Sequence, residues 1–139
     1  MITPEQENTG RAELEEMMLR LAQREYRKCC EVGELTGQMA EALDRNDQTS
    51  FGMLLKMRGE AMTEIEKARR DQGTLLKAYS DFKSRFEELG NGREVPDMSG
   101  MEKRILALAL SRKEALSRAK EFDRRVSRRL AGDRSYYSS

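Results

Sequence analysis

The chain has 139 residues, with 26 Lys and Arg against 25 Asp and Glu, and a net charge of +1. Charged and apolar residues each make up 37% of it, which is too polar for a membrane span and too rich in periodic apolar residues for a disordered chain. The absence of His excludes Ser-His-Asp triads, Cys-His nucleophiles, His-ligated zinc and Glu-x-x-His di-iron sites. A chain of this length is expected to form a single domain.

The beginning of the chain and its cysteines indicate a cellular compartment. Residues 1–10 are polar and acidic, without the basic start and apolar stretch of a signal peptide. The only cysteines, Cys29 and Cys30, are adjacent and therefore poorly placed to bridge each other. A cytoplasmic protein is expected.

The first predicted helix covers about residues 5–44, because its apolar residues recur at steps of three and four. They are Leu14, Met18, Leu21, Cys29, Val32, Met39 and Leu43. Arg45, Asn46 and Asp47 then predict a tight turn, with Asn46 or Asp47 as the cap of the next helix. A turn this short makes the two helices an antiparallel hairpin.

The second predicted helix covers about residues 48–89 and has the most regular heptad pattern of the chain. One heptad position holds Phe51, Arg58, Ile65, Gln72, Tyr79 and Phe86. The complementary position holds Leu54, Ala61, Ala68, Leu75, Phe82 and Leu89. This pattern predicts a long helix in coiled-coil-like packing.

A loop over residues 90–100 precedes a third helix over about 101–130 and a flexible tail over 131–139. Gly90, Asn91 and Gly92 suit a left-handed helix end, and Asp97 or Ser99 could cap the third helix. The predicted seam of this helix is Ile105, Leu108, Ala115, Ala119, Phe122, Val126 and Leu130. The fold class is therefore all-α: one domain, built as an elongated antiparallel three-helix bundle, that is, a coiled-coil-like hairpin plus a third helix.

The sequence predicts no catalytic residue, cofactor or metal site. Most carboxylates have a base three or four residues away, which is typical of a solvated helix face. Arg58 and Arg112 stand in heptad positions, where a polar residue selects register or partner. A helical enzyme built on buried Arg and Glu, as in some mutases, would use these two arginines and is the alternative.

Charge is segregated along the chain, with a net −4 over residues 1–46, −1 over 47–100 and +6 over 101–139. The basic third helix could be a footprint for nucleic acid. It could equally pair with the acidic first helix, and it lacks the interleaved aromatic residues of a base-stacking surface.

Some apolar residues fall outside the seams. Leu106 and Leu110 are four residues apart on the third helix, and Met53 and Met57 repeat that spacing on the second. They either widen the core or form a groove for an amphipathic helix of another protein, a use to which flexible Met is well suited. The candidate partner-binding residues are Ile105, Leu106, Leu108, Leu110, Leu116, Phe122, Met53 and Met57.

The segment over residues 35–65, LTGQMAEALDRNDQTSFGMLLKMRGEAMTEI, resembles the FlgN/FliT group of flagellar export chaperones. Shared features are a helix ending in Ala-Leu, a short Asn-Asp turn, and a helix with paired leucines, an Arg and an Ile. The resemblance implies a small, cytoplasmic, all-helical, non-enzymatic protein. Such a chaperone binds the C-terminal amphipathic helix of a late axial subunit and presents it to the export apparatus.

The basic third helix departs from this resemblance, since export chaperones are often acidic. Two further functions stay open. The seams could build a homo-oligomeric structural coiled coil, and the third helix could bind nucleic acid. No small-molecule substrate and no membrane span are expected.

Overall fold

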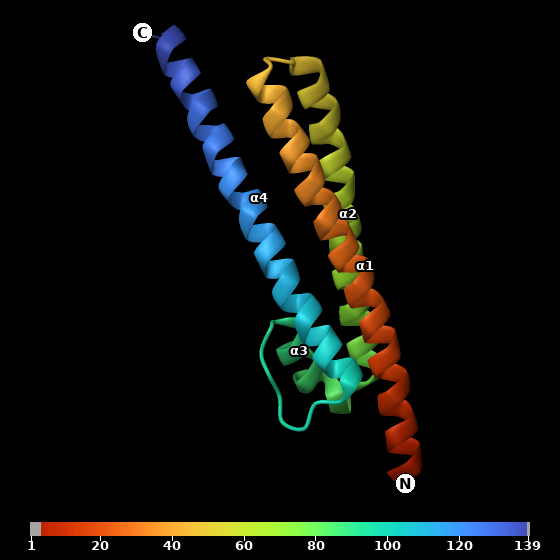
Figure 1. Cartoon of the computed structure of the whole chain (residues 1–139). Coiled ribbons are helices and arrows are strands. Elements are labelled where there is room, and N and C mark those ends of the chain that lie inside the picture. Colours follow the sequence, from red (N-terminus) through yellow and green to blue (C-terminus); the bar gives the residue numbers. More distant parts are fainter. Residues whose placement is uncertain (1–3, 139) are drawn as a thin grey trace.

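A computed structural model describes residues 4–138, with side chains over residues 10–129 and at Ala131. The described residues form helices and no strand, so the predicted all-α class is confirmed. The elements are α1 (Pro4–Asp44), α2 (Gln48–Ala78), the 3₁₀ turn η1 (Ser80–Phe82), α3 (Lys83–Gly90) and α4 (Gly100–Ser138). Figure 1 shows an elongated bundle in which α1 and α4 run in the same direction and α2 runs antiparallel to both. No helix within residues 4–138 has the length and apolar character required to cross a bilayer.

The turn between α1 and α2 forms as predicted. Asn46 takes a left-handed φ of 56°, and the Asp47 amide donates to the Ala42 carbonyl at 2.9 Å, which closes the end of α1. The Asp47 carboxylate then accepts from the Ser50 amide at 3.0 Å and caps α2. The same residue therefore ends one helix and starts the next, and the hairpin is tight.

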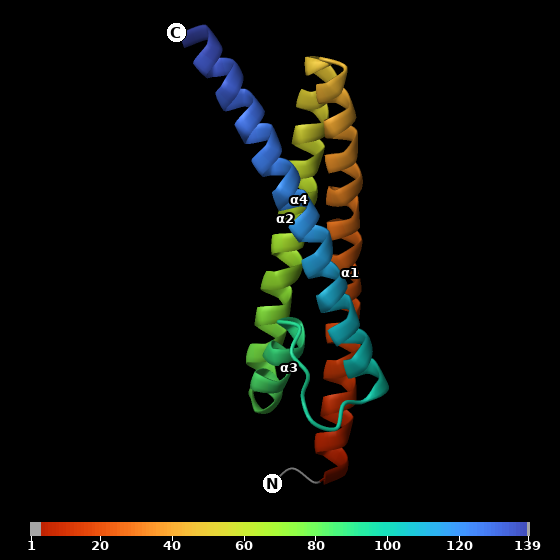
Figure 2. The same cartoon turned by 60° about the vertical axis from the view of Figure 1, so that its left-hand side comes forward.

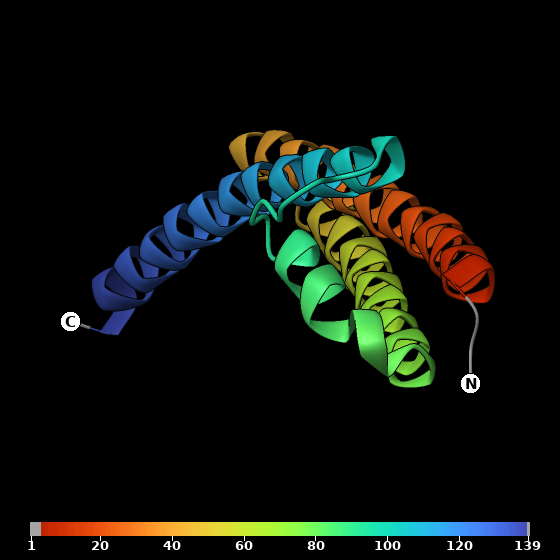
Figure 3. The ribbon, with the colours of Figure 1, turned by 90° about the horizontal axis from the view of Figure 1, so that it is seen from below.

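The prediction of one unbroken helix over 48–89 is wrong. Helix α2 ends at Ala78, Tyr79 leaves helical geometry with φ −122° and ψ 55°, and η1 leads into the short α3. Ser80 and Asp81 favour such a break because their side chains compete for backbone hydrogen bonds. Viewed from below, α3 lies beside α2 on the side next to α4 (Figure 3).

Helix α4 starts as predicted, at Gly100 with Ser99 as its cap, but it ends later than the sequence predicts. Ser99 and Glu102 form a reciprocal capping box: the Ser99 hydroxyl accepts from the Glu102 amide, and the Glu102 carboxylate accepts from the Ser99 amide. The tail predicted to be flexible over 131–139 is helical as far as Ser138. It contains no proline, and Gly132 alone costs a helix only about 1 kcal/mol.

The core is thick at one end of the bundle and thin in the middle. At the end that holds α3, large side chains from all four helices form one cluster: Leu14, Met18, Leu19, Leu76, Phe86, Leu89, Ile105 and Leu106. The cluster in the middle is smaller, and small residues dominate it: Cys29, Val32, Ala61, Ile65 and Ala119. Helix α4 packs closely at the thick end and then diverges from the hairpin (Figure 2).

Candidate functional site

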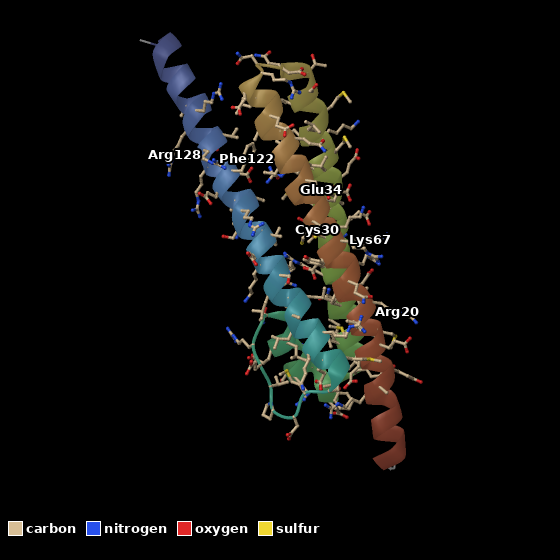
Figure 4. The ribbon with its side chains drawn as sticks, viewed as in Figure 1. Arg20, Cys30, Glu34, Lys67, Phe122 and Arg128 are labelled. Atoms are coloured by element: carbon tan, nitrogen blue, oxygen red, sulfur yellow. The ribbon has the colours of Figure 1, made fainter. Side chains whose placement is uncertain are left out.

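An open groove of about 660 Å³ lies between α1 and α4. Its α1 wall consists mostly of small residues: Cys29, Cys30, Gly33, Thr36, Gly37 and Ala40, with Tyr26 at one end and Glu34 at the rim. Its α4 wall consists of Ser111, Glu114, Ala115, Arg118, Ala119, Phe122 and Arg125. Figure 4 labels Cys30 and Glu34 on α1 and Phe122 on α4, across this groove; Arg20 and Lys67 lie on the side of the hairpin away from α4.

Local sequence explains why the groove stays open. A Cβ atom added at Gly33 or Gly37 would meet no other atom within 4 Å, so α4 does not pack against these two glycines. Small residues opposite them, such as Ala115 and Ala119, leave the space unfilled. Glycine lowers helix stability by about 1 kcal/mol relative to alanine, and among the described residues no side chain packs on Gly33 or Gly37 to compensate for it.

The groove offers packing and charge, and little reactive chemistry. Burial, followed by the neighbouring charge of Glu25, raises the pKa of Cys29 to about 11, so this thiol is protonated at neutral pH and is a poor nucleophile. Hydrogen bonding with Cys30 raises the pKa of Tyr26. No group of three or more His, Cys, Asp or Glu that could hold a metal ion occurs within the described part of the chain.

The predicted partner-binding residues do not share one surface. Ile105 and Leu106 are buried in the thick cluster, and Leu108 packs against it. Leu116 packs against the middle cluster, and Leu110 is 51% exposed and lies near Gly92. Of the candidates on α4, only Phe122 lines the groove.

For Leu106 the sequence left open whether it widens the core or forms part of a groove; it is buried and widens the core, where α3 adds a fourth layer. Met53 and Met57 are exposed and line a separate cleft of about 270 Å³ near the hairpin turn, together with Gln38, Glu41, Arg45, Ser50 and Leu54. Sequence reasoning missed the α1 wall of the groove. The available signal was the pair Gly33 and Gly37, which share a helix face with Cys30 and Ala40.

The arginines considered for catalysis are engaged in ion pairs. The Arg112 guanidinium donates to the buried Glu25 carboxylate at 3.1 Å and to the Gly90 carbonyl at 2.8 Å. Arg69 and Gln72 of α2 donate to the same carboxylate at 3.0 and 2.9 Å. The cavity beside this cluster has a volume of only about 10 Å³, which leaves no room for a substrate.

Arg58 is engaged in a different way. It is buried and holds both oxygens of Asp123 of α4, at 2.7 and 2.9 Å, while its Nε atom has no partner among the described residues. This bidentate pair joins α2 to α4 where the core is thin.

Comparison with known proteins returns no relative: the chain matches no protein-family model, no curated protein and no solved structure.

Proposed function

We propose that this chain is a non-enzymatic cytoplasmic export chaperone that holds an amphipathic helix of a flagellar axial subunit, of the hook–filament junction or cap type, before secretion. The observation that supports it is the groove between α1 and α4, which is lined mainly by apolar atoms and whose α1 wall consists mostly of small residues. Its volume of about 660 Å³ lies within the usual range for ligand sites. Its shape suits a helix lying lengthwise.

The dimensions of the groove agree with a helical occupant. The lining residues on α1 extend from Tyr26 to Ala40. At about 1.5 Å per residue this is about 21 Å, the length of a helix of about 14 residues. Gly33 and Gly37 would let the backbone of the bound helix come close to α1, as small residues do where helices pack tightly.

The decisive experiment fills the groove without disturbing the core. The full chain is titrated with fluorescein-labelled C-terminal helices of the hook–filament junction and cap subunits of the same organism. The double variant Gly33→Leu/Gly37→Leu places two large side chains in the groove, and we expect it to bind at least about 10-fold more weakly because the apolar contact area is lost.

The matched control is Gly52→Leu/Gly59→Leu, at two helical glycines of α2 that also have open space around the Cβ position. It should bind like the natural chain. Absence of binding by any of these helices, or an equal loss in both double variants, would show that the groove does not hold the client.

A second candidate function is self-association as a structural coiled coil, which the outer surface of α2 favours. Leu55 and Met62 are seven residues apart on one face of this helix and are 50% and 46% exposed, whereas Met53 and Met57 lie on a different face. Sedimentation equilibrium over a hundredfold concentration range tests this function. A dimer that Leu55→Lys/Met62→Lys dissociates would support it, and a monomer throughout would exclude it.

A further inference from the structure

The two walls of the groove carry opposite charge. Glu34 is the acid that lines the α1 wall. The stretch of α1 around it, residues 31–44, adds three acids outside the lining, Glu31, Glu41 and Asp44, and no base. Glu31 pairs with Lys28 of its own helix at 2.9 Å. Arg118 and Arg125 are the bases that line the α4 wall, with Glu114 beside them. The stretch of α4 around them, residues 117–129, contains six bases and only two acids. A substance lying between these walls therefore meets an anionic helix on one side and a cationic helix on the other.

These walls do not neutralise each other directly. In this part of the groove one ion pair among the described side chains crosses from α4 to α1: Arg129 to Asp44, at 3.6 Å, with both groups largely exposed. At the rim, Arg118 pairs with Glu114 of its own helix at 2.9 Å. The other α1–α4 pairs, Arg112 with Glu25 and Arg11 with Glu102, lie nearer the start of α4, where the helices pack closely. In the open part of the groove, most charged side chains of one wall therefore have no ion-pair partner among the described side chains of the other wall.

We infer, on the basis of the proposed function, that the occupant is an amphipathic helix whose two flanks differ in charge: carboxylates on the flank that faces α4 and bases on the flank that faces α1. A helix seated on the groove floor directs the residues on either side of its apolar stripe toward the two walls. Opposite charges on those flanks place every flanking residue beside its counterion. A helix with two acidic flanks, or with two basic flanks, matches one wall and is repelled by the other.

The test uses the full chain and three synthetic helical peptides of 21 residues with one shared apolar stripe. The first has one acidic and one basic flank, the second two acidic flanks, and the third two basic flanks. At low salt we expect the split peptide to bind about 10-fold more tightly than either of the others, the sum of a few exposed ion pairs. In 1 M NaCl, where charges are screened beyond about 3 Å, this preference should disappear.

Reversing the charge of one wall should change the preference in a defined direction. In Arg118→Glu/Arg125→Glu both walls are acidic, and the peptide with two basic flanks should become the tightest ligand. The matched control Arg70→Glu/Arg104→Glu makes the same change in net charge at exposed positions outside the groove lining. It should keep the preference for the split peptide.

The outcomes separate this inference from the proposed function. Equal affinity for the three peptides, or an unchanged preference in Arg118→Glu/Arg125→Glu, overturns the charge rule and leaves helix binding intact. Binding of none of the peptides overturns both. A 20-base-pair DNA duplex is the remaining probe: if it displaces the split peptide at equal concentration, the basic wall serves nucleic acid and the inference fails.

Discussion

Two buried carboxylates, Glu25 and Glu102, each connect their own helix to two other helices through ion pairs. Each is almost completely inaccessible to solvent, and each accepts hydrogen bonds from arginines of other elements. An ion removed from water costs several kcal/mol unless its partners are complete. Such a carboxylate therefore favours one register of the helices. Removal of one of its partners lowers the free energy of unfolding, because a buried charge is left without a counterion.

Glu102 should make stability depend on pH in the acid range. Burial alone would raise its pKa, but hydrogen bonds from Arg85, the Ser99 amide and Arg11 outweigh burial and lower it from 4.5 to about 2. Because the folded pKa lies below the unfolded one, the ionised group stabilises the fold above about pH 4.5, and this contribution disappears as the pH falls toward 2. Glu102→Gln should unfold with a free energy lower by about 2–3 kcal/mol at pH 7.

Urea unfolding of both chains at pH 7, 4.5, 3 and 2 measures this difference, which should shrink as the pH falls. Glu94→Gln, at an exposed loop position, is the control and should match the natural chain at every pH. A difference that stays constant down to pH 2 would show that the ionised state of Glu102 is not what stabilises the fold.

Glu25 should be needed for stability chiefly because of Arg112. In Glu25→Leu the guanidinium of Arg112 stays partly buried without its carboxylate, whereas Arg69 is half exposed and can be hydrated. We expect a loss of about 3 kcal/mol in the free energy of unfolding, with partial recovery in Glu25→Leu/Arg112→Met. Thermal unfolding of the single and double variants checks this. A double variant less stable than the single one would contradict it.

The sequence holds part of the information about these two residues. Glu25 lies seven residues from both Met18 and Val32, in the heptad series of α1, and Ser99 precedes Glu102 at the spacing of a capping box. Both positions are therefore recognisable as unusual. Their partners are not, because Arg11 and Glu102 are 91 residues apart, and only the docking of α4 on α1 brings them together.

At the scale of elements, the heptad pattern predicts which faces are buried but not that the long second helix is interrupted. Tyr79, Phe82, Phe86 and Leu89 keep their predicted positions toward the core, although η1 and α3 replace the expected helix. The reason is that a heptad pattern indicates which residues are buried, and an interrupted helix can bury the same residues as a continuous one. The groove was not predictable either, because small residues at a seam are also typical of close packing.

The glycines of α1 give a prediction at this scale. Because no atom lies within 4 Å of the Cβ position, Gly33→Ala and Gly37→Ala should each raise the free energy of unfolding by up to about 1 kcal/mol. Urea unfolding measures this. Gly92→Ala is the contrasting variant: with φ +79° and the Leu110 Cδ2 atom only 3.1 Å from the added carbon, it should lower stability. Destabilisation by Gly33→Ala would show that α4 does pack against this wall.

At the scale of the whole molecule, the bundle is unevenly held together. The capping box, the Glu102 and Glu25 ion pairs and the large side chains of the thick cluster all act on the first half of α4. Beyond Ala119 the one buried apolar side chain of α4 among the described residues is Phe122, and the ion pairs to the hairpin are Arg58–Asp123 and Arg129–Asp44. The half of α4 that forms the basic wall of the groove is therefore the half with the fewest contacts.

This unevenness predicts a gradient of amide hydrogen exchange along α4. Local opening costs less free energy where few buried contacts must be broken, so residues 122–129 should exchange faster than residues 102–116 by at least about tenfold. Asp123→Asn removes the charge that Arg58 holds, and we expect it to accelerate exchange in residues 122–129 alone. Asp81→Asn, at an exposed position in η1, is the control and should leave this segment unchanged.

A bound split-flank peptide should slow exchange over residues 26–40 and 111–125, the two walls of the groove. Uniform protection along α4, with no response to the peptide, would mean that the helix is docked along its whole length and that no groove opens for a partner.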